Sequence, residues 1–236
     1  MRLHSEAIEA ALNELGAFPI FYGRSKEEIL ELCEGGQIVN SAHRECLFQY
    51  GDHATFFGLI LSGAYKLSCP SVDGEDVIMH FATPGELLAV FVLTQSNPRF
   101  PVTATSIGSS RLLKLPRETY LNDWKRYPDQ VFKVQEMLAM RLCLLHSQRS
   151  LIKAPLAQKV AFLLITLAKK SSTSLGIITP TLTRKEIAES WGSSVESVIR
   201  IMSDWTKQGF IRTEAQEIQI LQPEKLIELS TQSIRA

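Results

Sequence analysis

The sequence predicts an α+β protein with a β-rich N-terminal half, one long helix and a helical C-terminal third. Between residues 37 and 116, short runs rich in β-branched and aromatic residues alternate with glycine-containing turns. An apolar periodicity typical of a helix then runs from Pro128 to about Ile152. Two short amphipathic helices and a small hairpin follow within residues 182–220.

Composition limits the class of protein. The chain has 236 residues, of which 45% are hydrophobic and 21% charged, so it has ample material for a core. We find no apolar run of transmembrane length, and the first fifteen residues are interrupted by glutamates, unlike a secretory signal. We therefore expect a cytoplasmic protein without membrane contact. The net charge of zero argues against a protein that coats nucleic acid without specificity. It allows a protein that recognises nucleic acid through basic groups on one face.

The residues that commonly bind metals are dispersed. Four cysteines are spread along the chain: Cys33, Cys46, Cys69 and Cys143. Without a C-x-x-C pair they predict neither a disulfide framework nor a zinc site, and we interpret each as a small buried hydrophobe. The histidines are equally scattered: His4, His43, His53, His80 and His146.

The N-terminal half predicts helices and then a β-roll. Residues 1–35 are expected to be largely helical, with one short helix at 26–32. Turns are predicted at Gly51-Asp52, Ser62-Gly63, Asp73-Gly74 and Pro84-Gly85. Strand-length segments lie between them, at residues 55–61, 64–69, 76–82, 102–107 and 110–115. An eight-stranded roll that ends near Pro116 is the simplest account.

The long helix carries apolar residues on two faces. One seam has coiled-coil spacing: Val131, Val134, Leu138, Leu145 and Ile152. A neighbouring stripe consists of Met137, Met140, Leu144 and Leu151. Such a helix favours a position between its own β-domain and the equivalent helix of a second copy, although a core helix of a single chain remains an alternative. The break at residues 153–155 then gives three domains: 1–127, 128–153 and 154–236.

The C-terminal third predicts a helix at residues 157–170, a polar loop at 171–174 and then a helical pair. Thr183 can cap the first helix of the pair, with Glu186 three residues later as in a capping box. Gly192 can end that helix, and Ser193 or Ser194 can cap the second.

The second helix has one apolar stripe that would hold it against the protein: Val198, Ile201, Met202 and Trp205. Its first turn is left exposed, as in a helix that reads the major groove of DNA. A hairpin at residues 211–220 would form the adjoining wing, and a short helix at 223–229 closes the chain. An ordinary helical hairpin is the alternative.

These residues resemble the Crp/Fnr family of bacterial transcription regulators. The strongest motif is T-R-x-E-I-A followed by G-S-S-V-E-S-V-x-R, within residues 183–200. Supporting segments are Y-G-D, L-S-G, D-G-E and T-P-G-E, at residues 50–52, 61–63, 73–75 and 83–86. The resemblance implies a cyclic-nucleotide-binding-like β-roll, a long dimerisation helix and a winged helix-turn-helix. It also implies three kinds of partner: double-stranded DNA, a second copy of the chain and RNA polymerase.

By this resemblance Glu196 and Arg200 read bases, and Val195 at the helix start is typical of the Fnr branch. A carboxylate can accept from cytosine N4–H, and a guanidinium matches the O6/N7 edge of guanine. We therefore expect a palindrome with TGA-like half-sites, whose flanking thymine methyl Ile199 could touch. Thr183, Ser194 and Ser197 are candidate phosphate contacts, because hydroxyls and helix N-termini position DNA without specifying sequence.

The effector is not specified by the sequence. Cyclic-nucleotide sensors of the family carry a Gly-Glu pair where this chain has Ala89 and Val90, and no Arg-Ser pair follows, so cyclic AMP is not expected. No cysteine precedes Cys33, which argues against an iron–sulfur cluster. Haem stays open, with no ligand to nominate. A small apolar effector could be enclosed by a set of roll and helix residues, each also suited to the core: Phe81, Leu88, Phe91, Leu93, Met137 and Met140. Arg99 is the further pocket candidate, because its guanidinium could meet a phosphate.

The leading hypothesis is a homodimeric, sequence-specific transcription regulator controlled by an unidentified small molecule. The alternative is a ligand-sensing or protein-interaction module whose winged domain does not read DNA. An enzyme is not expected, because we find no G-x-S-x-G, Walker A or H-E-x-x-H pattern.

Overall fold

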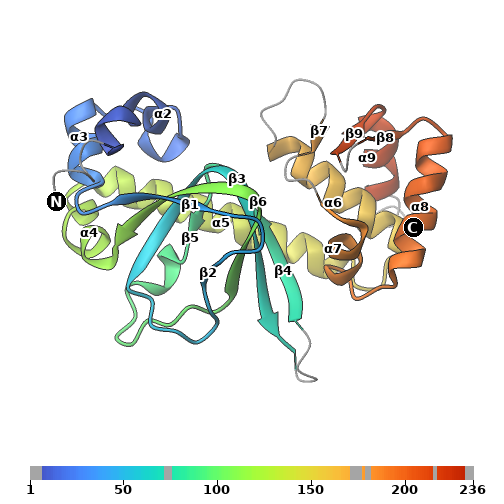
Figure 1. Ribbon diagram of the computed structural model, residues 1–236, viewed down its shortest axis with the longest axis horizontal. Coiled ribbons are helices and arrows are strands. Elements are labelled where there is room, and N and C mark those ends of the chain that lie inside the picture. Colours follow the sequence, from blue (N-terminus) through green and yellow to red (C-terminus); the bar gives the residue numbers. More distant parts are fainter. Residues whose placement is uncertain (1–6, 72–75, 171–176, 179–181, 215–216, 232–236) are drawn as a thin grey trace. The chain divides into compact units, whose positions relative to one another are not determined.

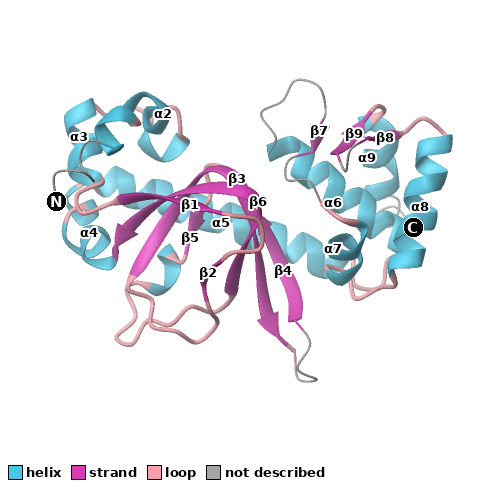
Figure 2. Cartoon of the chain, in the orientation of Figure 1, coloured by secondary structure: helices cyan, strands magenta, loops and turns pink. Residues whose placement is uncertain are grey.

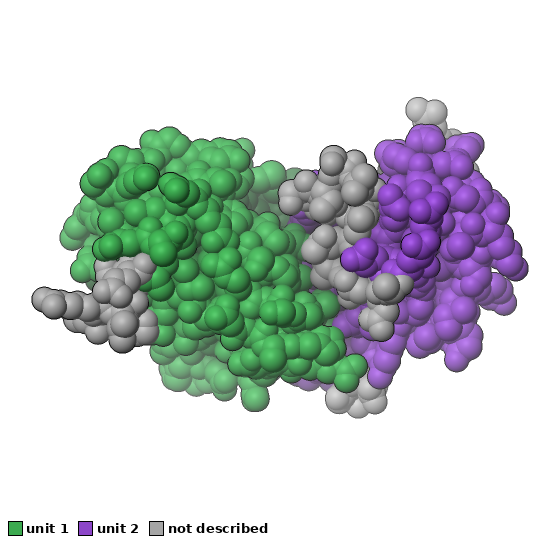
Figure 3. Space-filling model, turned by 45° about the horizontal axis from the view of Figure 1, so that its top comes forward, with its two compact units in different colours: residues 1–67, 82–143 green, residues 68–81, 144–236 purple. Residues whose placement is uncertain are grey.

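The computed structural model describes residues 7–71, 76–170, 177–178, 182–214 and 217–231 (Figure 1). The chain divides into two compact units (Figure 3): residues 1–67 with 82–143, and residues 68–81 with 144–236. This division falls inside the long helix, so the three predicted domains remain a prediction. Within the described ranges, we find no helix with both the length and the apolar character needed to span a bilayer.

Short helices precede the sheet, as predicted. The structure has α2 (Leu12–Gly16), η1 (Pro19–Phe21) and α3 (Lys26–Leu32). Helix α3 has the predicted bounds because a capping box fixes its start. The Ser25 Oγ accepts from the Glu28 N–H at 3.2 Å, and a Glu28 carboxylate oxygen accepts from the Ser25 N–H at 2.8 Å.

The roll is an antiparallel sheet (Figure 2). Its strands are β1 (Gln37–Ser41), β2 (Cys46–Phe48), β3 (Phe56–Pro70), β4 (Asp76–Ala82), β5 (Leu87–Leu88) and β6 (Thr103–Pro116). The order is β1-β6-β3-β4, with β2 also paired to β6 and β5 to β3. Strand β4 has the predicted bounds, and β1 runs antiparallel to β6 with Gln37 opposite Lys114.

The predicted count of eight strands is wrong, since six strands form this sheet in the described part of the chain. The predicted turn at Ser62-Gly63 does not form, and β3 continues through it. Gly63 has φ +73°, and a Cβ there would lie 2.4 Å from the Ser110 Oγ and 2.5 Å from the Ser109 carbonyl oxygen. The glycine therefore admits a close approach of β6 rather than a reversal. Strand β6 likewise joins the segments predicted at 102–107 and 110–115.

Two other predicted features, the turn at Asp73-Gly74 and the loop at 171–174, lie outside the described residues, as does His4.

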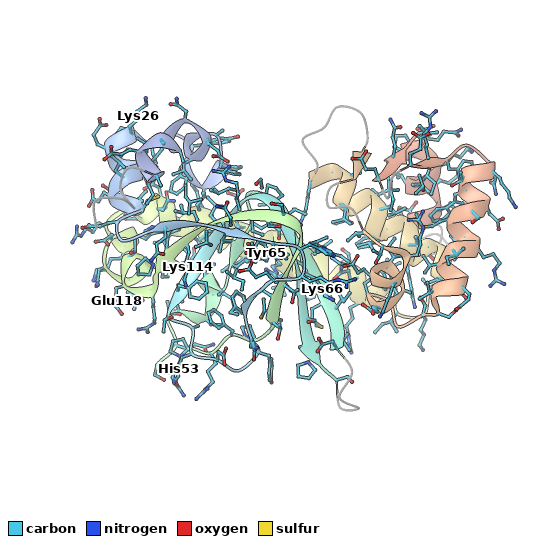
Figure 4. All side chains as sticks on the ribbon, in the orientation of Figure 1. Lys26, His53, Tyr65, Lys66, Lys114 and Glu118 are labelled. Carbon is cyan, nitrogen blue, oxygen red and sulfur yellow. The ribbon has the colours of Figure 1, made fainter. Side chains whose placement is uncertain are left out.

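The core of the first unit is aromatic at its centre. Trp124 is fully buried, packs edge-on against Phe57 at 5.0 Å between ring centroids, and donates from Nε1 to the Leu32 carbonyl at 2.8 Å. The side chain of Tyr65, labelled in Figure 4, is buried, and its hydroxyl lies 3.1 Å from the Ser41 Oγ. The buried Trp124 Nε1 and the buried Tyr65 hydroxyl thus each have a hydrogen-bond partner.

The first unit continues with α4 (Arg117–Asn122), η3 (Trp124–Arg126) and the long helix α5 (Pro128–Ser150), which begins as predicted. Gln130 is buried and donates from Nε2 to the Ile20 carbonyl at 2.8 Å, so it fixes the first turn of α5 to the roll.

The predicted partner-facing seam of α5 needs correction. Val134 is 2% exposed and belongs to the core of the first unit, and Leu138 packs against that core. These two residues therefore do not face a partner; they cover the roll of their own chain. Val131 is half-buried, whereas Leu145 and Ile152 are exposed. Other large apolar residues of α5 are exposed instead, namely Phe132 and, more than two turns further along the helix, Met140 and Leu142.

The second unit contains the helices α6 (Leu156–Lys170), α7 (Arg184–Glu189), α8 (Val195–Lys207) and α9 (Pro223–Thr231). A small antiparallel sheet has the order β7-β9-β8, from Ile177–Ile178, Glu217–Ile220 and Ile211–Glu214. The predicted helices and wing hairpin are confirmed, and β7 is an additional strand. Leu164 of α6 and Leu226 of α9 are fully buried where these two helices pack together.

The interpretation of the cysteines is correct only for Cys33, which is 1% exposed. Burial raises the pKa of its thiol to about 12. Cys46 and Cys143 are exposed, and Cys69 is half-buried. Among the described residues, no cluster of histidine, cysteine and carboxylate side chains could hold a metal ion.

Candidate DNA interface

Helix α7 is fixed at both ends by its own sequence. The Thr183 Oγ1 accepts from the Glu186 N–H at 3.1 Å, and a Glu186 carboxylate oxygen accepts from the Thr183 N–H at 2.8 Å, which confirms the predicted capping box. The helix ends at Glu189, earlier than the predicted stop at Gly192, and Gly192 has a φ of +58° in the turn that follows. Ile187 is buried, so α7 is held on the second unit.

Helix α8 begins at a serine cap. Ser194 has extended backbone geometry, and its Oγ accepts from the Ser197 N–H at 3.3 Å. The two serine hydroxyls lie 3.0 Å apart and are near the exposed helix start. The first-turn N–H groups of α8 therefore point outward with hydroxyls beside them.

One face of α8 is buried and the opposite face is exposed. Val198, Met202 and Trp205 are 0%, 1% and 5% exposed. The predicted base-reading side chains Glu196 and Arg200 are exposed, one helical turn apart. The helix thus presents a carboxylate and a guanidinium on its outer face.

The remaining predicted residues lie near this pair. Ile199 is 47% exposed and adjoins Arg200 on the outer face, whereas Val195 is half-buried at the helix start. Our prediction did not include Ser203 and Lys207, which are exposed. Their spacing of three and seven residues from Arg200 extends the same face and was visible in the sequence.

The wing is connected to α7 by a side-chain contact. The Arg184 Nη2 donates to the Thr213 Oγ1 of β8 at 3.0 Å, and burial lowers the pKa of Arg184. The Phe210 N–H donates to the Trp205 carbonyl at 2.9 Å, so the wing starts directly at the end of α8. The helices α7 and α8 and the hairpin β8–β9 are therefore held together, and we call them the reading head.

The predicted effector residues belong to two units and differ in burial. Phe81 belongs to the second unit, while the others belong to the first. Leu88 and Leu93 are buried in the core, whereas Phe91 and Met140 are 43% and 60% exposed. The Arg99 Nη1 donates to the Gly51 carbonyl at 2.6 Å on an exposed loop. The predicted effector pocket therefore remains a prediction.

A small cavity in the first unit does include one of them. It measures about 40 Å³, and Met137 lines it together with Glu86, Val90, Val134 and Arg141. Burial lowers the pKa of Arg141, and the nearby Glu86 carboxylate opposes that shift. The space holds only a few atoms.

These features define a winged helix-turn-helix protein with an exposed reading helix, joined to a β-roll. Comparison with known families gives the same two parts. The cyclic nucleotide-binding domain matches residues 25–127, and the Crp-like helix-turn-helix domain matches residues 158–229. The chain belongs to the Crp/Fnr family of transcription regulators, which is not a family of enzymes.

Two relatives show how far the similarity extends. The CRP-like cAMP-activated global transcriptional regulator of Mycobacterium tuberculosis is 27% identical over 214 residues, which cover 88% of this chain and 94% of that protein. The transcriptional activator protein FnrA of Stutzerimonas stutzeri is 26% identical, covering 75% of this chain and 73% of that protein.

Solved structures support the fold. FixK2 from Bradyrhizobium japonicum superposes with a TM-score of 0.73 at 19% identity, covering 82% of this chain and 96% of that chain. The regulator CLP from Xanthomonas campestris gives 0.67 at 15% identity, covering 83% and 99%. Regulators of the Crp type bind DNA and act as dimers.

Proposed function

We propose that this protein is a homodimeric regulator that reads a palindrome with TGA-like half-sites and responds to an effector in the β-roll. The observation that carries the proposal is the division of α8 into a buried face and an outer face that presents Glu196 and Arg200. A helix held in this way can enter the major groove without unfolding its supports.

Each exposed group on α8 has a base-edge counterpart. The Arg200 guanidinium can donate two parallel hydrogen bonds to O6 and N7 of guanine. The Glu196 carboxylate can accept from N4 of cytosine, and Ile199 can contact a thymine methyl. Val195, being half-buried, is restricted to the edge of this surface.

Phosphate contacts would set the register of α8 on the duplex. Ser194 and Ser197 lie at the N-terminus of α8, where the helix dipole and free N–H groups favour an anion. Thr183 occupies the corresponding position on α7, although its hydroxyl already donates to Glu186 at 2.8 Å. Thr183 would therefore contact phosphate through a bridging water that donates to the remaining lone pair of its hydroxyl.

The outer face of α5 is the surface that would meet a second copy. Phe132 is 68% exposed, and Ala139 and Cys143 are exposed seven and eleven residues later. That spacing follows the seam of two parallel helices. Leu142 at 53% exposure adjoins this line. The 128–153 segment would then join sensor and reader in each copy, and RNA polymerase is the further partner we propose.

An electrophoretic shift assay with the Arg200→Ala variant tests the proposal. Titration of a TGA-type palindrome and a scrambled duplex should show the specificity ratio falling by about 1–3 kcal/mol per half-site. Lys26→Ala, which removes an exposed cation from α3 in the first unit (Figure 4), serves as the control. The variant should keep its fold, because Arg200 is exposed.

Two results would contradict the proposal. Retention of the full sequence preference by the Arg200→Ala variant would remove the assigned base contact. Absence of any duplex binding at low salt would favour the alternative, a sensing module whose winged domain does not read DNA.

A further inference from the structure

The second unit contains a pocket of about 520 Å³ beside the reading head. Its walls come from strand β4, the end of α5, helix α6 and the turn between α7 and α8. All the lining residues belong to that one unit. The volume lies in the range of about 300–1,000 Å³ that is usual for small-molecule sites.

Exposed apolar side chains gather around this pocket. Val77 and Met79 of β4 are 39% and 43% exposed. Leu145 near the end of α5 is 37% exposed, and Ile152 just after that helix is 56% exposed. Exposed apolar surface has an unfavourable free energy of hydration, and a ligand that covers this surface removes that free energy. The pocket therefore favours a ligand with an apolar body.

The polar part of the wall is cationic. Arg149, Lys159 and Lys170 line the pocket together with one acid, Glu189. The Glu189 carboxylate already pairs with the Lys185 ammonium at 3.7 Å. Positive charge thus dominates the wall, and an anionic group on the ligand would be attracted to it.

Trp191 adds a hydrogen-bond donor to the same wall. Its Nε1 is shielded from solvent and is the one buried side-chain nitrogen or oxygen without a hydrogen-bond partner in the part of the chain described. The Lys159 ammonium lies 6.0 Å from the centroid of the Trp191 ring. Because buried donors are normally paired, an acceptor near Lys159 would satisfy both groups after a small side-chain shift.

We propose that this pocket binds a small organic carboxylate with an aromatic or aliphatic body. The body covers Met79 and Ile152, and the carboxylate lies between Lys159 and Trp191. The site includes Phe81 of strand β4, one of the predicted effector residues, but its other walls lie outside the β-roll, and it does not depend on DNA recognition. Its floor includes Ser190 to Gly192, the turn that leads into α8, so occupancy would also restrain the start of the reading helix.

Isothermal titration of the full-length protein with 4-phenylbutyrate tests the site, and 4-phenylbutyramide serves as the neutral analogue. We expect saturable one-site binding of the carboxylate, and about tenfold weaker binding of the amide because it lacks the charge. Binding should also change the tryptophan fluorescence, and Trp191→Phe should remove that change. Neither readout involves DNA, so their failure is separate from failure of the proposed function.

Matched variants locate the binding. Lys159→Gln and Met79→Asp should each weaken the affinity by about tenfold. Lys26→Gln, an exposed lysine of the first unit, and Ile227→Asp, which has the same 43% exposure as Met79 but does not line the pocket, should leave it unchanged. Circular dichroism of each variant confirms that it is folded.

The proposal is overturned if the carboxylate does not bind at millimolar concentration, or if it binds equally to the Lys159→Gln and Met79→Asp variants. Equal affinity for 4-phenylbutyramide and 4-phenylbutyrate would overturn the proposal that the pocket recognises an anionic group. Loss of binding on dimerisation would show that a second copy covers Leu145 and Ile152, and would overturn it as well.

Discussion

Phe132 offers the sharpest test of how two copies would associate. This side chain is 68% exposed on the outer face of α5. Taking about 200 Å² for a phenylalanine, about 135 Å² remains in contact with water in the single chain. At about 25 cal/mol per Å², covering it contributes about 3.5 kcal/mol per copy, and about 7 kcal/mol per dimer.

The buried area overstates the effect on association for two reasons. Part of the free energy gained by burial offsets the freedom that the two chains and their side chains lose on binding, and alanine retains some apolar surface. Taking half of the larger figure, Phe132→Ala should weaken the dimer by about 3.5 kcal/mol, which is about 300-fold in the dissociation constant. The fold should be kept, since the side chain is largely outside the core of its own chain.

Sedimentation equilibrium at several protein concentrations measures this constant directly. Phe91→Ala is the control, because Phe91 is 43% exposed in the same unit but lies on η2 (Val90–Val92) rather than on α5. If Phe132→Ala dimerises as tightly as the unmodified protein, the outer face of α5 is not the interface and the reasoning from exposure is refuted.

Three further outcomes concern stability. Ser194→Ala removes the cap of α8 and should lower the free energy of unfolding by about 1 kcal/mol in urea denaturation, whereas Ser203→Ala, on the exposed face of that helix, should change it little. Gly63→Ala should cost more than about 2 kcal/mol by the same measurement, because its Cβ would meet β6; Gly51→Ala shares the positive φ but has open space, so it should cost only about 1 kcal/mol. Burial raises the pKa of Cys33 from 9.0 to about 12, so the folded state retains this proton more tightly than the unfolded chain. The contribution of the buried neutral thiol to the free energy of unfolding is therefore complete below pH 9 and is lost as the pH rises towards 12. Cys33→Ala should flatten the fall in the free energy of unfolding that is measured over that pH range.

The reading head could be predicted because its determinants are local. Thr183 and Glu186 are three residues apart, and the stripe from Val198 to Trp205 follows the helical period. Each of these signals acts within two turns of one helix. The boundaries of α8 and the exposure of Arg200 therefore followed from the sequence.

The sheet was predicted less well because a glycine has two uses in a β-rich region. Gly63 has the sequence context of a turn, yet its lack of a Cβ lets β6 approach closely. That use depends on Ser110, which is distant in sequence. The same ambiguity divided β6 into two predicted segments, and so the strand count came out too high.

Helix α5 shows a second limit. Both of its faces carry apolar residues, and sequence spacing alone does not say which face covers the roll. The structure decides through Gln130, whose hydrogen bond to the Ile20 carbonyl fixes the rotation of the helix. That rotation turns Val134 inward and Phe132 outward.

The same contrast explains why the ligand is harder to predict than the DNA site. A pocket joins residues from several elements, as Met79, Lys159 and Trp191 do in the second unit, and no local spacing links them. Apart from Arg99, the residues predicted from the sequence to line an effector pocket were apolar, because apolar residues suit a pocket, but they suit a core equally well. What distinguishes a site is exposed apolar surface next to unpaired polar groups, and this combination is visible only after the chain has folded. In this chain the combination occurs beside the turn that precedes α8, where ligand binding and DNA reading would share the same few residues.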